Sequence, residues 1–96
     1  MTHYIAVIHK DPDSSFGISF PDVPGVITSA DTLDKVLQQA AEVLAFAAED
    51  WEELTGQPFP SPRTLDQLRS DPEFTEQREE AIIAAVPFKE KLGAAA

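Results

Sequence analysis

Histidines, serines and clustered carboxylates are the side chains of this sequence whose chemistry would suit catalysis or metal binding. His3 and His9 lie six residues apart in one predicted strand, on the same face but about 20 Å apart. That separation prevents them from sharing a metal ion. Ser14, Ser15 and Ser19 lack a nearby histidine with an evident orienting acid, which a nucleophilic serine requires. P-loop, G-x-G-x-x-G and H-E-x-x-H motifs are also missing, so the sequence gives no support for an enzyme or a cofactor.

Four carboxylates fall within the five residues EDWEE, near the end of a predicted long helix. Paired carboxylates can bind metals or transfer protons, but a solvated helix face around a buried Trp51 is the simpler interpretation. Negative charges this late in a helix oppose its dipole. Because carboxylates at that position destabilise the helix, their presence indicates a use in binding basic groups. The four residues are Glu49, Asp50, Glu52 and Glu53.

The composition limits the class of protein. The chain has 96 residues, which suits one domain, and a net charge of −10 from 17 acidic and 7 basic residues. Such a charge argues against direct nucleic-acid binding. It favours a basic partner, or it serves only to keep the protein in solution. Cysteine is absent, which excludes disulfides, and the N-terminus resembles neither a secretory signal nor a membrane span. We therefore expect a cytoplasmic protein.

Hydrophobic patterning predicts a β-hairpin followed by a rigid corner. The segments 3–10 and 16–20 read as its strands, and the first is apolar on both faces, as expected for a central or doubly covered strand. The corner is PDVPG: proline ends the strand, Asp22 stabilises the turn, and Gly25 can supply a positive φ. A third strand is predicted at 26–30, with Val26 and Ile27 in the core.

A long helix is predicted at residues 32–55, with Asp31 as N-cap and Gly56 as C-cap. Its apolar stripe consists of Leu33, Leu37, Ala40, Leu44, Ala47, Trp51 and Leu54. A stiff proline connector follows, and then one or two helical turns in TLDQLRSD, capped by Ser61 or Thr64. The segment 81–88 favours a last strand. The fold class is therefore α+β, in the order β-β-β-α-α-β.

These motifs resemble the N-terminal domain of HicB-type antitoxins. The resemblance covers about residues 4–86, and its specific part is FPDVPG followed by the helix start ADTLD, with PFPSPRTLDQL matching the family's connector and short helix. It implies a partial ribonuclease H-like fold: a three-stranded antiparallel sheet, a long helix packed on it, a short helix and a further strand. It also implies a non-catalytic antitoxin of a type II toxin–antitoxin system, which binds a small basic HicA-type toxin and masks its mRNA-cleaving site.

The sequence departs from the family pattern at its end, where most members add a DNA-binding domain. We expect residues 1–88 to form the antitoxin domain and 89–96 a flexible tail, without a DNA-binding domain. An alternative is a domain that only assembles with itself, as a homodimer or homotetramer, by pairing the edge of strand VITSA or AIIAAVPF. A residual Mg²⁺ nuclease ranks last, because the strand cores contain no acids.

The toxin-binding surface is predicted to combine acids from two regions. Asp11, Asp13 and Asp22 lie on loops at the edge of the predicted sheet, and Glu49, Asp50, Glu52 and Glu53 lie on the helix. These carboxylates would contact Lys and Arg of the toxin and mainly accelerate association. No catalytic or metal-binding residue is predicted.

Overall fold

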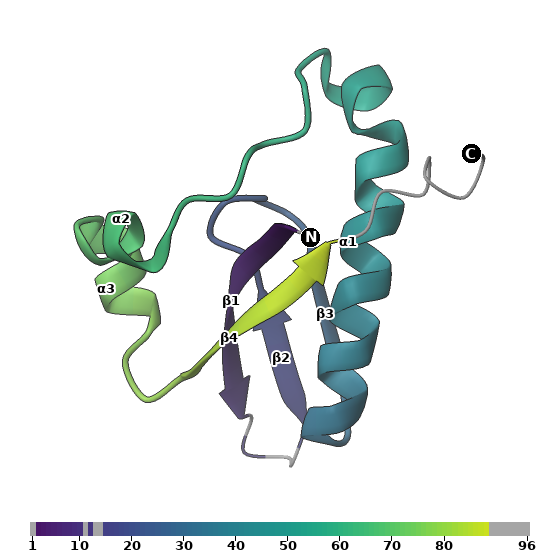
Figure 1. The fold of residues 1–96 in the computed structure, drawn as a ribbon. Coiled ribbons are helices and arrows are strands. Elements are labelled where there is room, and N and C mark those ends of the chain that lie inside the picture. Colours follow the sequence, from purple (N-terminus) through teal and green to yellow (C-terminus); the bar gives the residue numbers. More distant parts are fainter. Residues whose placement is uncertain (1, 11, 13–14, 89–96) are drawn as a thin grey trace.

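Four strands form one antiparallel sheet in the order β3-β2-β1-β4 (Figure 1). The structure is a computed structural model that describes residues 2–10, 12 and 15–88. The strands are β1 (Thr2–Lys10), β2 (Phe16–Ser19), β3 (Ile27–Ala30) and β4 (Ile82–Phe88). The hairpin and the third strand are as predicted. The predicted last strand joins the same sheet beside β1, so the sheet has four strands.

The central strand β1 is covered on both faces, which explains its nearly continuous apolar sequence. On one face Tyr4, Ala6 and Ile8 are buried against α1 (Leu33–Thr55). On the other face Val7 is buried in a second cluster beneath two short helices. The two clusters alternate along β1 because successive strand residues point to opposite faces.

Helix α1 packs on one face of the sheet through Val36, Ala40 and Leu44 (Figure 1). Its N-cap is Thr32, whose hydroxyl accepts from the Lys35 N–H at 3.2 Å. The N-cap predicted from the sequence, Asp31, was one residue too early. Asp31 and Thr32 are neighbours in the chain, and both residue types suit the cap position. The predicted C-cap is confirmed, since Gly56 has φ 76° and its N–H bonds to the Glu52 carbonyl at 2.8 Å.

The end of α1 differs from the predicted apolar stripe. Leu54 is 80% exposed, although its spacing predicted burial. A helix of 23 residues is about 34 Å long, whereas the four-residue strands β2 and β3 each span about 13 Å. The last turn of α1 therefore extends beyond β2 and β3, and Trp51 is only half-buried.

Two short helices cover the opposite face of the sheet. The N-cap of helix α2 (Leu65–Arg69) is Thr64, one of the two predicted caps, which forms a capping box with Gln67. Helix α3 (Pro72–Gln77) was not predicted, although Asp71 as N-cap and proline in the first turn are a recognisable start signal. Leu68 and Phe74 from these helices pack on Val7 of β1. None of the helices in the described ranges is long and apolar enough to span a membrane.

Burial around the third strand differs from the prediction that Val26 and Ile27 both lie in the core. Val26 is buried as expected, but Ile27 is 67% exposed. Ile27 pairs with Ser19, so its side chain lies on the face opposite α1, and α2 and α3 cover that face mainly over β1 and β4. Apolar residue type predicted burial, whereas the alternation of strand faces decided it.

Candidate functional site

The PDVPG corner holds a carboxylate that ties distant segments together. The turn closes with Val23 N–H to Phe20 carbonyl at 3.1 Å and Val26 N–H to Val23 carbonyl at 3.2 Å. Gly25 has φ 88°, as predicted for a residue that supplies a positive φ. Within this turn the Asp22 side chain is only 5% exposed. A buried carboxylate requires a partner, and that partner comes from the proline connector.

The partner of Asp22 is Arg63, 41 residues further along the chain. The Arg63 backbone N–H donates to Asp22 Oδ2 at 2.8 Å, and its side-chain Nε donates to Oδ1 at 2.6 Å. A further nitrogen of the guanidinium donates to Asp71 Oδ2 at 3.1 Å. We call Asp22, Arg63 and Asp71 the Asp–Arg–Asp latch. These hydrogen bonds to the two carboxylates raise the pKa of Arg63 above its usual value.

A group of aromatic rings holds the same connector nearer to α1. Phe59 packs edge-on against Tyr4 and Trp51, with ring centroids 5.7 and 5.4 Å apart. Its ring also stacks on Phe88 of β4 at 5.4 Å. The Tyr4 hydroxyl donates to the Pro60 carbonyl. The connector is therefore attached at two places, by the aromatic group at one end and by the latch at the other.

The latch makes the attachment of α3 sensitive to acid. The Glu73 N–H and the Arg63 guanidinium lower the pKa of Asp71 below its usual value. The folded state therefore binds a proton at Asp71 less readily than the unfolded state does. The stability from this group is present above the usual carboxyl range and is lost as the pH falls below it.

We therefore expect amides of α3 to exchange faster relative to those of β1 as the pH is lowered through the carboxyl range, after correction for intrinsic rates. Asp71→Asn should remove this contribution to the pH dependence, because its side chain does not titrate there. The check is amide hydrogen exchange on the two proteins at matched pH values. The same pH dependence in both proteins would contradict the assignment to Asp71.

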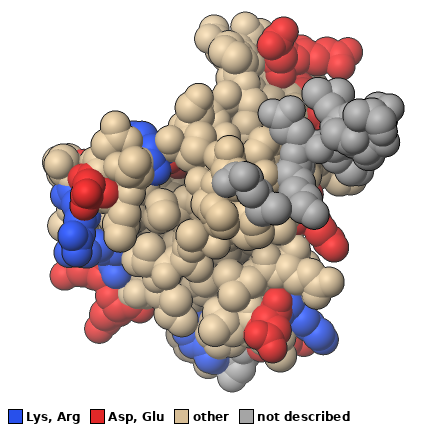
Figure 2. All heavy atoms as spheres, viewed as in Figure 1, with Lys and Arg blue, Asp and Glu red and all other residues tan. Residues whose placement is uncertain are grey.

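Helix α1 presents an acidic face with an aromatic residue at its centre. At 100° per residue, Glu42, Glu49, Asp50 and Glu53 lie within about 60° of Phe46 around the helix. All five residues are exposed, and Phe46 is 68% exposed. Figure 2 shows red side chains gathered at the end of α1. We call these five residues the acidic helix face. An exposed aromatic residue with a charged rim is typical of a protein-binding surface.

The predicted toxin-binding residues divide into four groups. Asp11 and Asp13 lie outside the described residues. Glu49, Asp50 and Glu53 lie together on the acidic helix face, whereas Glu52 is exposed about 120° from Phe46 around the helix. Asp22 forms an ion pair with Arg63, which favours a role for Asp22 in positioning the proline connector. Direct contact of any of these residues with a partner stays a prediction.

Phe46 and Glu42 were not singled out from the sequence. The signal that identifies Phe46 is its place on the helical wheel, because it lies opposite the stripe that packs on the sheet. A large apolar residue on the solvent side of an amphipathic helix calls for an explanation other than the core. Its position among four carboxylates makes it a candidate anchor for a partner.

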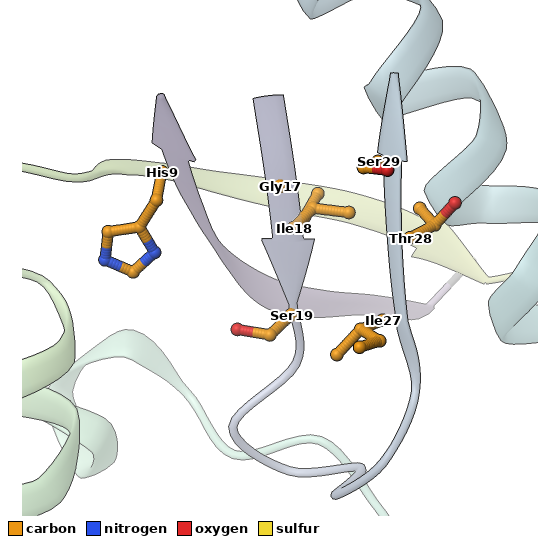
Figure 3. A pocket seen from close by; sticks show the side chains of 7 residues that line it. All are labelled: His9, Gly17, Ile18, Ser19, Ile27, Thr28 and Ser29. Carbon is orange, nitrogen blue, oxygen red and sulfur yellow. The ribbon is translucent and has the colours of Figure 1, made fainter. Parts of the chain in front are cut away.

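The sheet carries a second candidate site, an open hollow of about 610 Å³ on the face opposite α1. Figure 3 shows that His9, Ser19 and Ile27, on three neighbouring strands, contribute to its lining. His9 Nε2 lies 2.9 Å from the Gln77 carbonyl, so this nitrogen donates a hydrogen bond and does not act as a base. The lining contains no carboxylate to orient the histidine. Among the described residues, no three His, Asp or Glu side chains cluster in a way that could hold a metal ion.

The chain matches one protein family along most of its length. The family profile described as "HicB_like antitoxin of bacterial toxin-antitoxin system" matches residues 4–91. No curated protein matches the sequence significantly. Solved structures provide the remaining comparisons.

Several solved structures share the fold. The chain is similar to the N-terminal domain of the Burkholderia pseudomallei antitoxin HicB, with 26% identity and a TM-score of 0.72 over 92% of this chain and 99% of that one. It resembles the longer B. pseudomallei HicB with 27% identity and a TM-score of 0.69 over 93% of this chain, but spans only 63% of that protein. It also resembles a chain of the HicA3 and HicB3 toxin–antitoxin complex, with 26% identity and a TM-score of 0.70 over 92% of this chain and 99% of that one.

Proposed function

The chain belongs to the family of HicB-like antitoxins of bacterial toxin–antitoxin systems, and we propose that it acts without catalysis, by binding a small basic HicA-type toxin and masking its mRNA-cleaving site. The observation that carries the choice of partner is the similarity to a chain of the HicA3 and HicB3 complex, over 92% of this sequence. The α+β fold, with a sheet covered by helices on both faces, agrees with the family resemblance. The proposal includes action in the cytoplasm and no direct contact with nucleic acid.

The acidic helix face is the surface that we assign to the toxin. Its carboxylates would attract a basic protein over a distance and raise the association rate. Phe46 would then supply the apolar contact that slows dissociation, because buried aromatic anchors carry much of the energy of small interfaces. Charge and apolar surface at one place make this face a better candidate than the hollow on the sheet, whose lining has no carboxylate.

The test is co-expression of this chain with the product of the neighbouring small basic reading frame. We expect a stable complex and loss of mRNA cleavage when the chain is added to the toxin in equal amounts. The isolated toxin serves as the positive control for cleavage, and this chain alone should leave the mRNA intact. Failure of the two proteins to copurify, or cleavage unchanged in the mixture, would contradict the proposal.

Self-assembly is the alternative that a specific observation favours. Both candidate strands, β3 and β4, lie at the edges of the sheet, where each has a neighbouring strand on one side only within the described residues. Edge strands present unpaired backbone groups that can bind another strand. Formation of a homodimer or homotetramer is compatible with toxin binding, because the acidic helix face belongs to neither edge.

A further inference from the structure

We propose that the projecting end of α1 is a second anchor for the toxin, where an apolar toxin side chain packs on Trp51 and Leu54. A Lys or Arg beside that side chain contacts the carboxylates of Asp50 and Glu53. This inference rests on the proposed function, and it adds that the toxin lies along α1 and not across it. We call residues 51–55 the projecting turn, because α1 extends there beyond β2 and β3 (Figure 1).

The first observation is the exposed apolar surface of the projecting turn. Leu54 is the most exposed large apolar side chain among the described residues. It lies within about 20° of Ala47 around the helix, so it continues the stripe that packs on the sheet. Trp51 lies one turn earlier, beside Leu54, and is half-buried. The chain therefore places two large apolar side chains together where the fold only partly covers them, as at an interaction site.

The second observation is that the projecting turn is held firmly. Thr55 Oγ1 donates to the Trp51 carbonyl at 2.7 Å, and the Gly56 N–H donates to the Glu52 carbonyl at 2.8 Å. The Phe59 ring packs edge-on against the Trp51 ring, with 5.4 Å between the centroids. Because these contacts already restrain the backbone and the indole, binding a partner costs less conformational entropy.

The third observation is the charge around the two apolar side chains, which selects a basic occupant. Asp50, Glu52 and Glu53 lie in the last two turns of α1, and its last turn has no basic residue. Carboxylates there oppose the helix dipole, whose negative end is the C-terminus. A Lys or Arg is attracted both by the carboxylates and by the helix end. A second copy of the chain, with its own charge of −10, is repelled.

The direction of the contact follows from the spacing of Phe46, Asp50 and Leu54. These residues are four apart, so each lies about 40° around the helix from the one before. Phe46 and Leu54 are about 12 Å apart along the helix axis, and Asp50 lies between them. A toxin element that lies along α1 reaches both exposed apolar residues, whereas an element that crosses α1 steeply reaches only one.

The test compares Leu54→Ala with Leu65→Ala, the same substitution at an exposed leucine of α2. Alanine suits a helix at least as well as leucine, so both variants should fold, and circular dichroism checks this. Leu54→Ala should raise the dissociation constant of the toxin complex about tenfold, mainly through faster dissociation. Leu65→Ala should leave it unchanged. Surface-binding kinetics with the purified toxin measure both constants.

The outcomes separate this inference from the proposed function. A toxin complex that Leu54→Ala does not weaken would keep the toxin as partner and overturn the projecting turn as an anchor. Equal weakening by Leu54→Ala and Leu65→Ala would also overturn it, because the effect would not be specific to α1. A wild-type chain that does not bind the toxin at all would overturn both proposals.

Trp51 provides an independent measurement, because it is the only tryptophan of the chain. An apolar side chain packed on the indole excludes water, so the Trp51 fluorescence should move to shorter wavelength when the toxin binds. The complex of the Trp51→Phe variant supplies the background from the toxin. Unchanged Trp51 emission in the toxin complex would overturn the proposal. The same shift on concentrating the chain alone would assign the surface to a second copy and would also overturn it.

Discussion

Arg63→Met is expected to lower the free energy of unfolding by about 1–3 kcal/mol, because it leaves the Asp22 carboxylate buried with fewer partners. The lower end of this range applies if water reaches the site, since the Arg63 side chain is 39% exposed. The substitution keeps the backbone N–H that donates to Asp22 Oδ2 at 2.8 Å and removes the side-chain bonds to both aspartates. Urea unfolding measures the change.

The same variant should loosen the two short helices more than the rest of the fold. Because the latch joins the corner to the connector and to the N-cap of α3, hydrogen exchange should increase first in α2 and α3 and least in β1. The control is Arg69→Met, which removes an exposed arginine from the last turn of α2. Equal destabilisation by the two substitutions would show that the latch contributes nothing beyond an ordinary surface charge.

Asp50→Lys combined with Glu53→Lys is expected to slow association with the toxin by about 10–100-fold at low salt. The two substitutions replace negative charge by positive charge in the middle of the acidic helix face, where a basic partner would approach. The difference from wild type should shrink as salt is added, because the attraction acts between solvated charges. Stopped-flow or surface-binding kinetics with the purified toxin measure the rate.

The matched control is Glu76→Lys combined with Glu79→Lys, since both acids are exposed but lie on α3 and the turn after it. This pair changes the net charge of the chain by the same amount. An equal loss of rate in both pairs would mean that total charge, and not the acidic helix face, attracts the toxin. Phe46→Ala should act differently, raising the dissociation rate about tenfold or more and leaving association almost unchanged.

Residue patterns alone predicted most of the elements and their order. The apolar sequence of β1 indicated a doubly covered strand, and the structure places it between β2 and β4 with a helical layer on each face. The C-cap of α1 at Gly56 and the N-cap of α2 at Thr64 were also recognisable, since each depends on local chemistry. Helix α3 was missed, although its N-cap Asp71 and the proline in its first turn are readable in the sequence.

The candidate site depended more on tertiary structure. The sequence indicated a use of the EDWEE acids in binding basic groups, but only the packing of α1 on the sheet shows that Phe46 faces solvent among them. Asp22 looked like a turn residue and a candidate contact. Its bonds to Arg63 depend on how the connector folds back over 41 residues, which no local pattern encodes.

The sequence by itself determined the strands, the long helix, its C-cap and the acidic character of the chain, because these depend on residue type and on spacings of a few positions. It also determined the family, through the FPDVPG corner and the helix start after it. Only the tertiary structure decided which apolar residues stay exposed, as with Ile27 and Leu54, and which acids are already paired. The physical reason is that burial and ion pairing depend on which surfaces meet, and those surfaces come from segments far apart in the chain.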